Sequence, residues 1–426
     1  MIKLQANLPP APSKGGGEAP SLLGRACITY LLTTTPLPPV SLVVKGETLN
    51  IGIAGVRGLS NLIGFNASDD VQVTALCDLD EDVLKQQQKD HGIANGYRVF
   101  DDMLESDIDA VVIATPMQCH VPQAIAALQA GKHVMSEVTA GVTMDELWWL
   151  IENVEQSGKV YMMAENYCYM PDNQLILSLV QKGMLGDVYY GEGEYLHNIQ
   201  SLVTYNYDMR HSGKTSWRKY WQLGKRGAFY PTHSIGPVMQ WFGDDRIESI
   251  TSFGSGRHCD FSLRQEDTNI TMCQLASRKL ARIRLDTISP RPHQMAYYTI
   301  QGTKGVVEAS RVAGQDAMIW LKGMDDSVDE AKWKPLHEFR EHLPERYLNA
   351  TDEQKNAGHA GGDFFIVEDF VNAVKKGTPP AIDVYQACEW TAVGLLSELS
   401  ITNQNRTMDM PNFRKNMPYE EQIIKL

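Results

Sequence analysis

The sequence has few cysteines, and their spacing does not suggest pairs. Seven cysteines are scattered over 426 residues, and no two of them form a Cys-x-x-Cys motif. An odd and scattered set argues against a disulfide framework, and the eleven histidines include no His-x-x-x-His pair. A metal site is therefore not expected. Scattered, unpaired cysteines are typical of a reducing compartment, so we expect a cytoplasmic protein.

Basic residues are also scarce. Lysine and arginine number 39 against 52 aspartate and glutamate residues, which gives a formal net charge of -13. Nucleic acids and anionic membranes attract basic surfaces, so neither is an expected partner. No apolar run is long enough to span a bilayer. A P-loop and a Gly-x-Ser-x-Gly elbow are absent too, which argues against two common classes of phosphate-binding protein and hydrolase.

The chain is longer than one hydrophobic core usually organises, so its length predicts two domains. Residues 1–47 differ from the rest because they are rich in proline and contain three consecutive glycines. We expect this segment to be a flexible extension or sequence upstream of the true start, since its apolar part comes too late for a cleavable signal. Residues 414–426 are expected to form a C-terminal tail.

Apolar strands alternate with helices over residues 48–166. The strands are nearly continuous apolar runs, as expected for strands buried on both faces. The expected strands are Leu49 to Ala54, Val71 to Asp78, Asp109 to Ala114, Lys132 to Glu137 and Val160 to Ala164, and the clearest helices are Val121 to Leu128 and Asp145 to Gln156. This alternation predicts a parallel sheet with helices on both faces.

The turn after the first strand carries the signal for a cofactor. Gly55 and Gly58 would let the backbone approach a pyrophosphate at the start of a helix, although Arg57 stands where a full G-x-G-x-x-G motif has its second glycine. Asp78 ends the second strand 23 positions after Gly55, close to the spacing of a carboxylate that binds ribose hydroxyls. Each feature alone also fits a plain turn or a helix N-cap. Together they predict a dinucleotide site that prefers NAD, because the carboxylate would repel the extra phosphate of NADP.

Residues 167–413 contain strands with few helices between them. The expected strands are Val188 to His197, Ile247 to Phe253, Thr268 to Leu275, Ala281 to Ile288 and Ala296 to Gln301, with a hairpin turn at Gly302 to Gly305. This pattern predicts a mostly antiparallel, open sheet. Phe364 to Val374 and Tyr385 to Leu399 are expected to be amphipathic helices that pack back against the first domain.

Several segments of the first half resemble one family. These are Ala114-Thr115-Pro116, His120, Ala127-Leu128 and Gly131 to Val134. From Leu49 to near Phe413 the chain resembles the glucose–fructose oxidoreductase / inositol dehydrogenase / MocA family. The resemblance implies an N-terminal Rossmann domain (48–166) and a C-terminal α/β domain with a large open sheet (167–413). It also implies a homo-oligomer, a dimer or tetramer, that pairs through this sheet. The implied cofactor contacts are Thr115, Pro116, His120, Glu137 and Asn166.

The sequence departs from that family at one informative position. The family usually reads Glu-Lys-Pro where this chain reads Glu137-Val138-Thr139, and valine cannot relay a proton as the lysine does. Later segments resemble a branch that contains NAD-dependent α-N-acetylgalactosaminidases and related NAD-using glycosidases. These segments are Met162 to Tyr169, Gly193 to Asn198, Tyr230 to Pro237, Ser289 to His293, Gln301 to Gly305 and Gly358 to Asp363.

This branch implies a redox-neutral glycosidase, a known exception to the two-carboxylate mechanism. Bound NAD would oxidise carbon three of the sugar, which makes the proton on carbon two acidic and lets the aglycone leave from carbon one. Water addition and return of the hydride would complete the cycle. His233 is the expected base for the hydroxyl proton, since imidazole titrates near neutral pH. Tyr195 and Tyr298 are candidates for further proton steps and Tyr230 lines the same site, although alternation lets only one of Tyr297 and Tyr298 point inward.

The expected substrate contacts are Trp217, Arg218, Arg291 and His359. The arginines could bind sugar hydroxyls, carboxylates or sulfonates, or form surface ion pairs, and His359 could instead order the start of the next helix. Two further functions stay open. One is a sugar or cyclitol dehydrogenase that releases NADH, and the other is a non-catalytic NAD-binding sensor.

Overall fold

The computed structural model describes residues 48–203, 215–292, 294–312, 314–324 and 331–414. The predicted extension and almost all of the predicted tail lie outside the described residues. None of the helices within these ranges is both long and apolar enough to cross a membrane.

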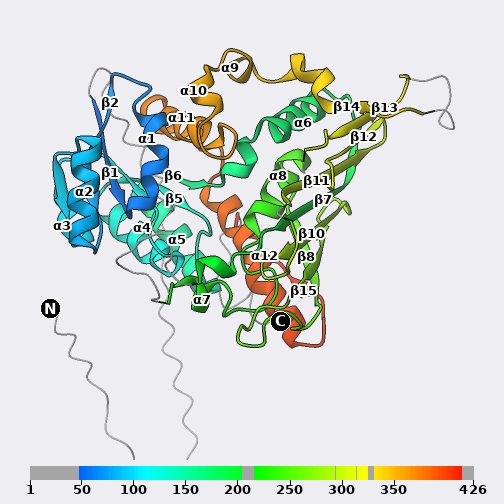
Figure 1. Ribbon diagram of the computed structural model, residues 1–426, viewed down its shortest axis with the longest axis horizontal. Coiled ribbons are helices and arrows are strands. Elements are labelled where there is room, and N and C mark those ends of the chain that lie inside the picture. Colours follow the sequence, from blue (N-terminus) through cyan, green and yellow to red (C-terminus); the bar gives the residue numbers. More distant parts are fainter. Residues whose placement is uncertain (1–47, 204–214, 293, 313, 325–330, 415–426) are drawn as a thin grey trace, which may run out of the picture. The chain divides into compact units, whose positions relative to one another are not determined.

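Six parallel strands form the first sheet, in the order β3-β2-β1-β4-β5-β6 (Figure 1). The strands are β1 (Leu49–Ala54), β2 (Val71–Cys77), β3 (Asn95–Tyr97), β4 (Ala110–Ile113), β5 (His133–Glu137) and β6 (Tyr161–Ala164). The accompanying helices are α1 (Leu62–Phe65), α2 (Glu81–His91), α3 (Phe100–Leu104), α4 (His120–Gln129) and α5 (Met144–Ser157). This strand order is that of a Rossmann fold, and it confirms the predicted fold class.

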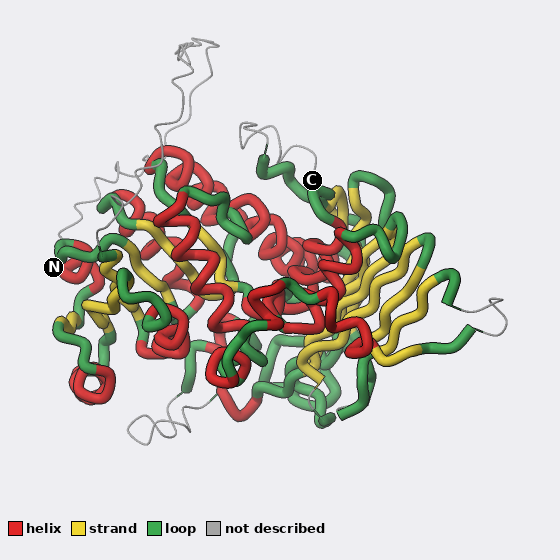
Figure 2. The backbone as a smooth tube through the Cα atoms, turned by 90° about the horizontal axis from the view of Figure 1, so that it is seen from above, coloured by secondary structure: helices red, strands yellow, loops and turns green. Residues whose placement is uncertain are grey.

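Nine strands form the second sheet, in the order β14-β13-β12-β11-β7-β10-β9-β8-β15. They are β7 (Val188–Leu196), β8 (Ile247–Gly254), β9 (Asn269–Leu275), β10 (Leu280–Asp286), β11 (Gln294–Gly302), β12 (Gly305–Glu308), β13 (Met318–Leu321), β14 (Lys334–Pro335) and β15 (Met408–Asp409). Among the strands that the structure describes here, only β7 and β10 pair in parallel, so the sheet is mostly antiparallel as predicted. Helices cover one of its faces (Figure 2).

The helices of this second part are α6 (Pro171–Gln181), α7 (Arg218–Trp221), α8 (Thr232–Phe242), α9 (Glu345–Leu348), α10 (Asp352–Lys355), α11 (Gly362–Lys376) and α12 (Val384–Thr402). The last of them corrects a prediction. Helix α12 is not amphipathic, because it packs against β8 of the second sheet and also against α5 and β6 of the Rossmann part. Five consecutive residues, Trp390 to Gly394, are buried, so the buried positions lie on several sides of the helix.

Glu389 on α12 provides a test of this buried position. Its carboxylate accepts a hydrogen bond from the Ile247 amide at 3.3 Å. Burial raises the pKa of Glu389 to about 7, against the opposing effects of that amide and of Arg414 and Arg246. The folded protein thus holds this proton more tightly than the unfolded chain, whose carboxyl has the ordinary value of 4.5. The contribution of this proton to the free energy of unfolding is therefore fully present below pH 4.5, and it is lost as the pH rises to about 7.

Glu389→Gln should remove this loss. We expect the variant to gain about 2 kcal/mol over the wild type between pH 4.5 and pH 8. Urea unfolding of both proteins across this range measures the difference, and Glu353→Gln, at an exposed position on α10, is the control. A difference in stability that does not change with pH would refute the prediction.

Candidate active site

The first element of the site is the glycine turn between β1 and the 3-10 helix η1 (Val56–Asn61). Gly55 has a φ of 86°, and a Cβ atom there would lie 2.6 Å from the Ala114 carbonyl oxygen. At Gly58 a Cβ atom would lie 2.8 Å from the Ile53 side chain. Both positions therefore require glycine, because the turn presses against the ends of β1 and β4. Arg57 between them is exposed.

Asp78, at the end of β2, is held against this turn. One of its carboxylate oxygens accepts a hydrogen bond from the Val56 amide at 3.1 Å, and the other accepts one from the Asp80 amide at 3.0 Å. The carboxylate thus lies beside the glycine turn, as a dinucleotide site requires. A tight turn with glycines at Gly55 and Gly58, next to a carboxylate, fits the pyrophosphate and ribose of NAD.

The loops after β4 and β5 are tied together by His120. Its ring nitrogens lie 2.8 Å from the Thr115 carbonyl oxygen and 2.9 Å from the Thr139 carbonyl oxygen. The sequence predicts a cofactor contact at His120, and in the structure both of its ring nitrogens are engaged within the protein. His120 therefore sets the spacing of the two loops that carry Thr115-Pro116 and Glu137-Val138.

His233 lies in the first turn of α8 and is almost completely buried. Its Nδ1 atom is 2.7 Å from Oε1 of Glu165, a fully buried carboxylate at the carboxyl end of β6. Glu165 also accepts the Tyr167 amide hydrogen, while its Oε2 atom has no partner among the described residues. A carboxylate at Nδ1 fixes the imidazole tautomer, which leaves Nε2 for proton exchange.

Three tyrosines surround His233. The Tyr167 ring stacks on the imidazole with a centroid distance of 4.1 Å, and Tyr195 and Tyr230 lie at 5.0 and 5.1 Å. Burial, together with neighbouring groups such as Glu165, raises the pKa of all three phenols. They keep their protons at neutral pH, so they are suited to donate hydrogen bonds rather than to act as bases.

Tyr297 and Tyr298 point to opposite faces of the second sheet. The Tyr298 hydroxyl is buried and donates to the carbonyl oxygen of His233, so Tyr298 supports the start of α8. The Tyr297 ring lies on the other face, where the Arg311 guanidinium is 3.9 Å from its centroid. Tyr298 is therefore the residue that points inward, but its hydroxyl hydrogen is already donated to the backbone of His233.

Helix α7 brings the predicted substrate contacts Trp217 and Arg218 to this site. Trp217 packs with Phe229 and Tyr230 against Met117 and Val142, in the loops after β4 and β5. The Arg218 guanidinium lies 4.6 Å from the centroid of the Trp217 ring and donates to Gln222. Its charge acts on Tyr195 and Tyr230, whose pKa values it lowers against the effect of burial.

The other two predicted substrate contacts lie in different places. Arg291 is half-buried and lines a hollow of about 550 Å³ together with Asn198, Gln200 and Ser201. His359 lies 5.7 Å from the Tyr167 ring, between centroids, and is paired with Asp363. Thus His359 borders the aromatic cluster, whereas Arg291 lies beyond the carboxyl ends of β7 and β10, among the residues that follow Tyr195 and His197.

Glu165 and Tyr167 were not predicted as site residues. A signal for Glu165 was present, because a carboxylate directly follows the fully buried strand Tyr161–Ala164. Polar residues at the carboxyl ends of parallel strands face the ligand crevice of such sheets. Tyr167 gave no such signal, since its role depends on the rings that surround it.

Comparisons with known proteins agree with this arrangement. Residues 49–165 match the model of an oxidoreductase family with an NAD-binding Rossmann fold. Levoglucosan dehydrogenase in complex with NADH has the same fold, with a TM-score of 0.71 at 18% identity, over 86% of this chain and all of that one. Scyllo-inositol dehydrogenase of Lactobacillus casei gives a TM-score of 0.62, also at 18% identity, over 85% of this chain and 98% of that one.

The second half identifies the branch. Residues 169–263 and 255–419 match the model of the glycosyl hydrolase 109 C-terminal domain. A glycosyl hydrolase family 109 protein of Shewanella pealeana is 30% identical, over 88% of this chain and 87% of its own. An α-N-acetylgalactosaminidase of Shewanella oneidensis is 29% identical, over 87% of this chain and 86% of its own. The chain belongs to glycosyl hydrolase family 109.

Proposed function

We propose that the protein is an NAD-dependent glycosidase that oxidises carbon three of its sugar transiently and restores it after cleavage. The observation that carries this proposal is the buried Glu165–His233 pair at the carboxyl end of β6, surrounded by tyrosines. Family membership supports hydrolysis over net oxidation. Val138, at the position of the usual proton-relaying lysine, supports it as well.

In this mechanism His233 handles the proton of the reacting hydroxyl. Its Nε2 atom takes that proton, and the Glu165 carboxylate, 2.7 Å from Nδ1, stabilises the imidazolium that results. NAD, when bound, supplies the acceptor for the hydride of carbon three and returns it at the end. The ketone at carbon three would make the proton on carbon two acidic, and loss of that proton would expel the aglycone from carbon one. Water would then add across the resulting double bond, with its hydroxyl on carbon one and its proton on carbon two, before the ketone is reduced again. Trp217 and Arg218 would bind the sugar, and Tyr195 and Tyr230 would donate hydrogen bonds to it.

The expected cofactor contacts lie at the carboxyl ends of the strands of the first sheet. Gly55, Arg57, Gly58 and Asp78 would hold the adenosine and pyrophosphate. Thr115, Pro116, Glu137 and Asn166 would line the nicotinamide half. The Asn166 Oδ1 atom is buried and has no partner among the described residues, so it can accept a hydrogen bond from the ligand.

The test is a panel of chromogenic glycosides in which phenol release and NADH absorbance are followed together. α-N-Acetylgalactosaminides come first, because a relative carries that activity in its name. We expect aglycone release without net formation of NADH. Accumulation of NADH from free sugars, with no aglycone release, would instead identify a dehydrogenase.

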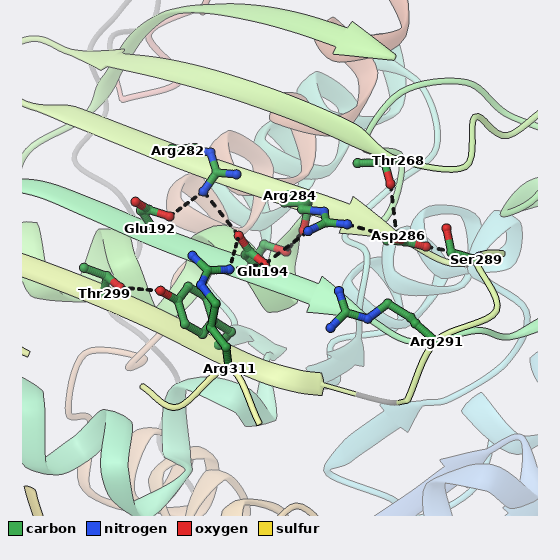
Figure 3. A network of polar contacts seen from close by, with 12 residues as sticks. Glu192, Glu194, Thr268, Arg282, Arg284, Asp286, Ser289, Arg291, Thr299 and Arg311 are labelled. Carbon is green, nitrogen blue, oxygen red and sulfur yellow. Dashed lines mark hydrogen bonds and ion pairs between the residues drawn. The ribbon is translucent and has the colours of Figure 1, made fainter. Parts of the chain in front are cut away.

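We further propose that the protein is cytoplasmic and assembles through the uncovered face of the second sheet. The six cysteines of the described residues are all free, which suits a reducing compartment. On the sheet face, Glu194 is surrounded by Arg282, Arg284 and Arg311 (Figure 3). Glu194 is only 1% exposed, so this ionic network is already ordered and offers a rigid surface to a second copy. Light scattering of the purified protein measures the assembly.

A further inference from the structure

The segment Gly358 to Asp363 bridges two parts of the cofactor crevice. It leads into α11, whose residues contact both η1, after β1, and η3 (Asn166–Tyr169), after β6. In the sheet, β1 and β6 stand on either side of β4 and β5. The segment therefore lies near the carboxyl ends of the strands, where a dinucleotide binds. His359 and Ala360 hold φ angles of 57° and 56° there, values that non-glycine residues rarely adopt.

His359 is fixed at one ring nitrogen. Its Nδ1 atom lies 2.9 Å from Oδ1 of Asp363, and the Asn166 side-chain nitrogen lies 2.9 Å from the same oxygen. The Asn166 nitrogen also lies 2.9 Å from Nδ1 of His359. The Asp363 carboxylate can only accept, so we assign the donated hydrogens of both His359 Nδ1 and Asn166 to it. His359 and Asn166 thus share one anchor, and the Nε2 atom of His359 is left for a ligand.

The surroundings of His359 are suited to an anion. Burial alone would lower the pKa of His359, but the hydrogen bond to Asp363 and the charge of Asp363 outweigh it, so the pKa lies above its usual value. The charge of Arg57, in the glycine turn, reaches both His359 and Asp363. The His359 imidazole therefore lies within reach of the charge of Arg57, at the glycine turn that would hold a pyrophosphate, and both side chains can donate hydrogen bonds to an anion.

We propose that His359, positioned by Asp363, binds the phosphate on the nicotinamide side of the cofactor pyrophosphate. This role differs from the sugar contact expected from the sequence, because His359 shares its anchor with Asn166 on the cofactor side. The sugar contacts Tyr195, Tyr230 and Arg218 gather around His233. The inference rests on the proposed function only in that NAD is the cofactor.

The test compares nucleotides that do or do not carry the second phosphate. We would measure the binding of NAD, ADP and AMP to the wild type and to His359→Gln by calorimetry after removal of bound nucleotide, with no sugar present. His359→Gln should weaken NAD and ADP about tenfold, the size expected for one charge-assisted hydrogen bond, and leave AMP unchanged. The amount of NAD that copurifies should also fall.

His337→Gln is the matched control, because His337 lies 3.5 Å from Asp316 in an exposed pair far from this segment in sequence. It should bind all three nucleotides as the wild type does. Equal weakening of AMP in His359→Gln would show a general disturbance of the fold and overturn the proposal, as would unchanged binding of NAD and ADP. A wild type that does not bind NAD would contradict the proposed function itself.

Discussion

His233→Gln should lower kcat for aglycone release by about a thousandfold, within the range that a general base contributes. The variant loses the imidazole that takes the hydroxyl proton, but glutamine can still donate a hydrogen bond to the buried Glu165. The fold and the bound NAD should therefore be retained. Stopped-flow absorbance with a chromogenic glycoside measures both release of the aglycone and any transient NADH in one experiment, and both signals should disappear together.

Two companion variants make this test specific. His258→Gln removes an exposed imidazole whose Nε2 atom lies 2.9 Å from the Ser255 carbonyl oxygen in the same loop, and it should leave kcat unchanged. Glu165→Gln keeps the shape of the pair but removes its charge, so kcat should fall about tenfold or more with KM unaltered. A loss of less than tenfold in His233→Gln would show that another group takes the proton.

Gly55→Ala should abolish tight NAD binding. The residue has a φ of 86°, and the added methyl group would lie 2.6 Å from the Ala114 carbonyl oxygen, so the ends of β1 and β4 must move apart. Positive φ alone costs a non-glycine residue about 1–2 kcal/mol. The collision adds to this cost and displaces the turn that faces the pyrophosphate. We expect NAD binding to weaken by about a hundredfold or more, as measured by calorimetry.

Gly92→Ala separates the two effects. Gly92 has a φ of 67°, but nothing lies within 4 Å of the added Cβ atom. It should therefore lose stability by about 1 kcal/mol while binding NAD normally. If Gly55→Ala behaved in the same way as Gly92→Ala, the close contact with Ala114 would have no role in cofactor binding.

Local patterns in the sequence predicted much of the fold. The five apolar strands of the Rossmann half were predicted within one residue at each end, because strands buried on both faces leave a continuous apolar signal. The sixth strand, β3 (Asn95–Tyr97), was not predicted, because it is short and lacks such a run. In the second sheet, β7 to β11 were predicted within two residues at each end, with β10 ending at Asp286 and β11 beginning at Gln294. The short strands β12 to β15 were not predicted.

The site was less predictable because its partners are far apart in the chain. Glu165 and His233 are separated by 68 positions, and Asn166 and Asp363 by 197. No local pattern records such pairs. The orientation of Tyr298 was equally hidden, since two adjacent tyrosines in a strand look alike until the sheet is packed. His120 has a further role that the sequence did not indicate, because its ring nitrogens join two loops of the protein.

The position of α12 has a consequence for how the chain can be divided. The Thr391 hydroxyl accepts the Ala140 amide hydrogen at 3.1 Å, and the Ile382 carbonyl oxygen accepts that of Met163 on β6 at 3.2 Å. The Rossmann half is thus completed by residues that a ribosome adds more than two hundred positions later. During synthesis, the faces of α5 and β6 that α12 covers stay exposed until the end. A fragment ending at residue 166 should therefore aggregate rather than serve as a separate NAD-binding module.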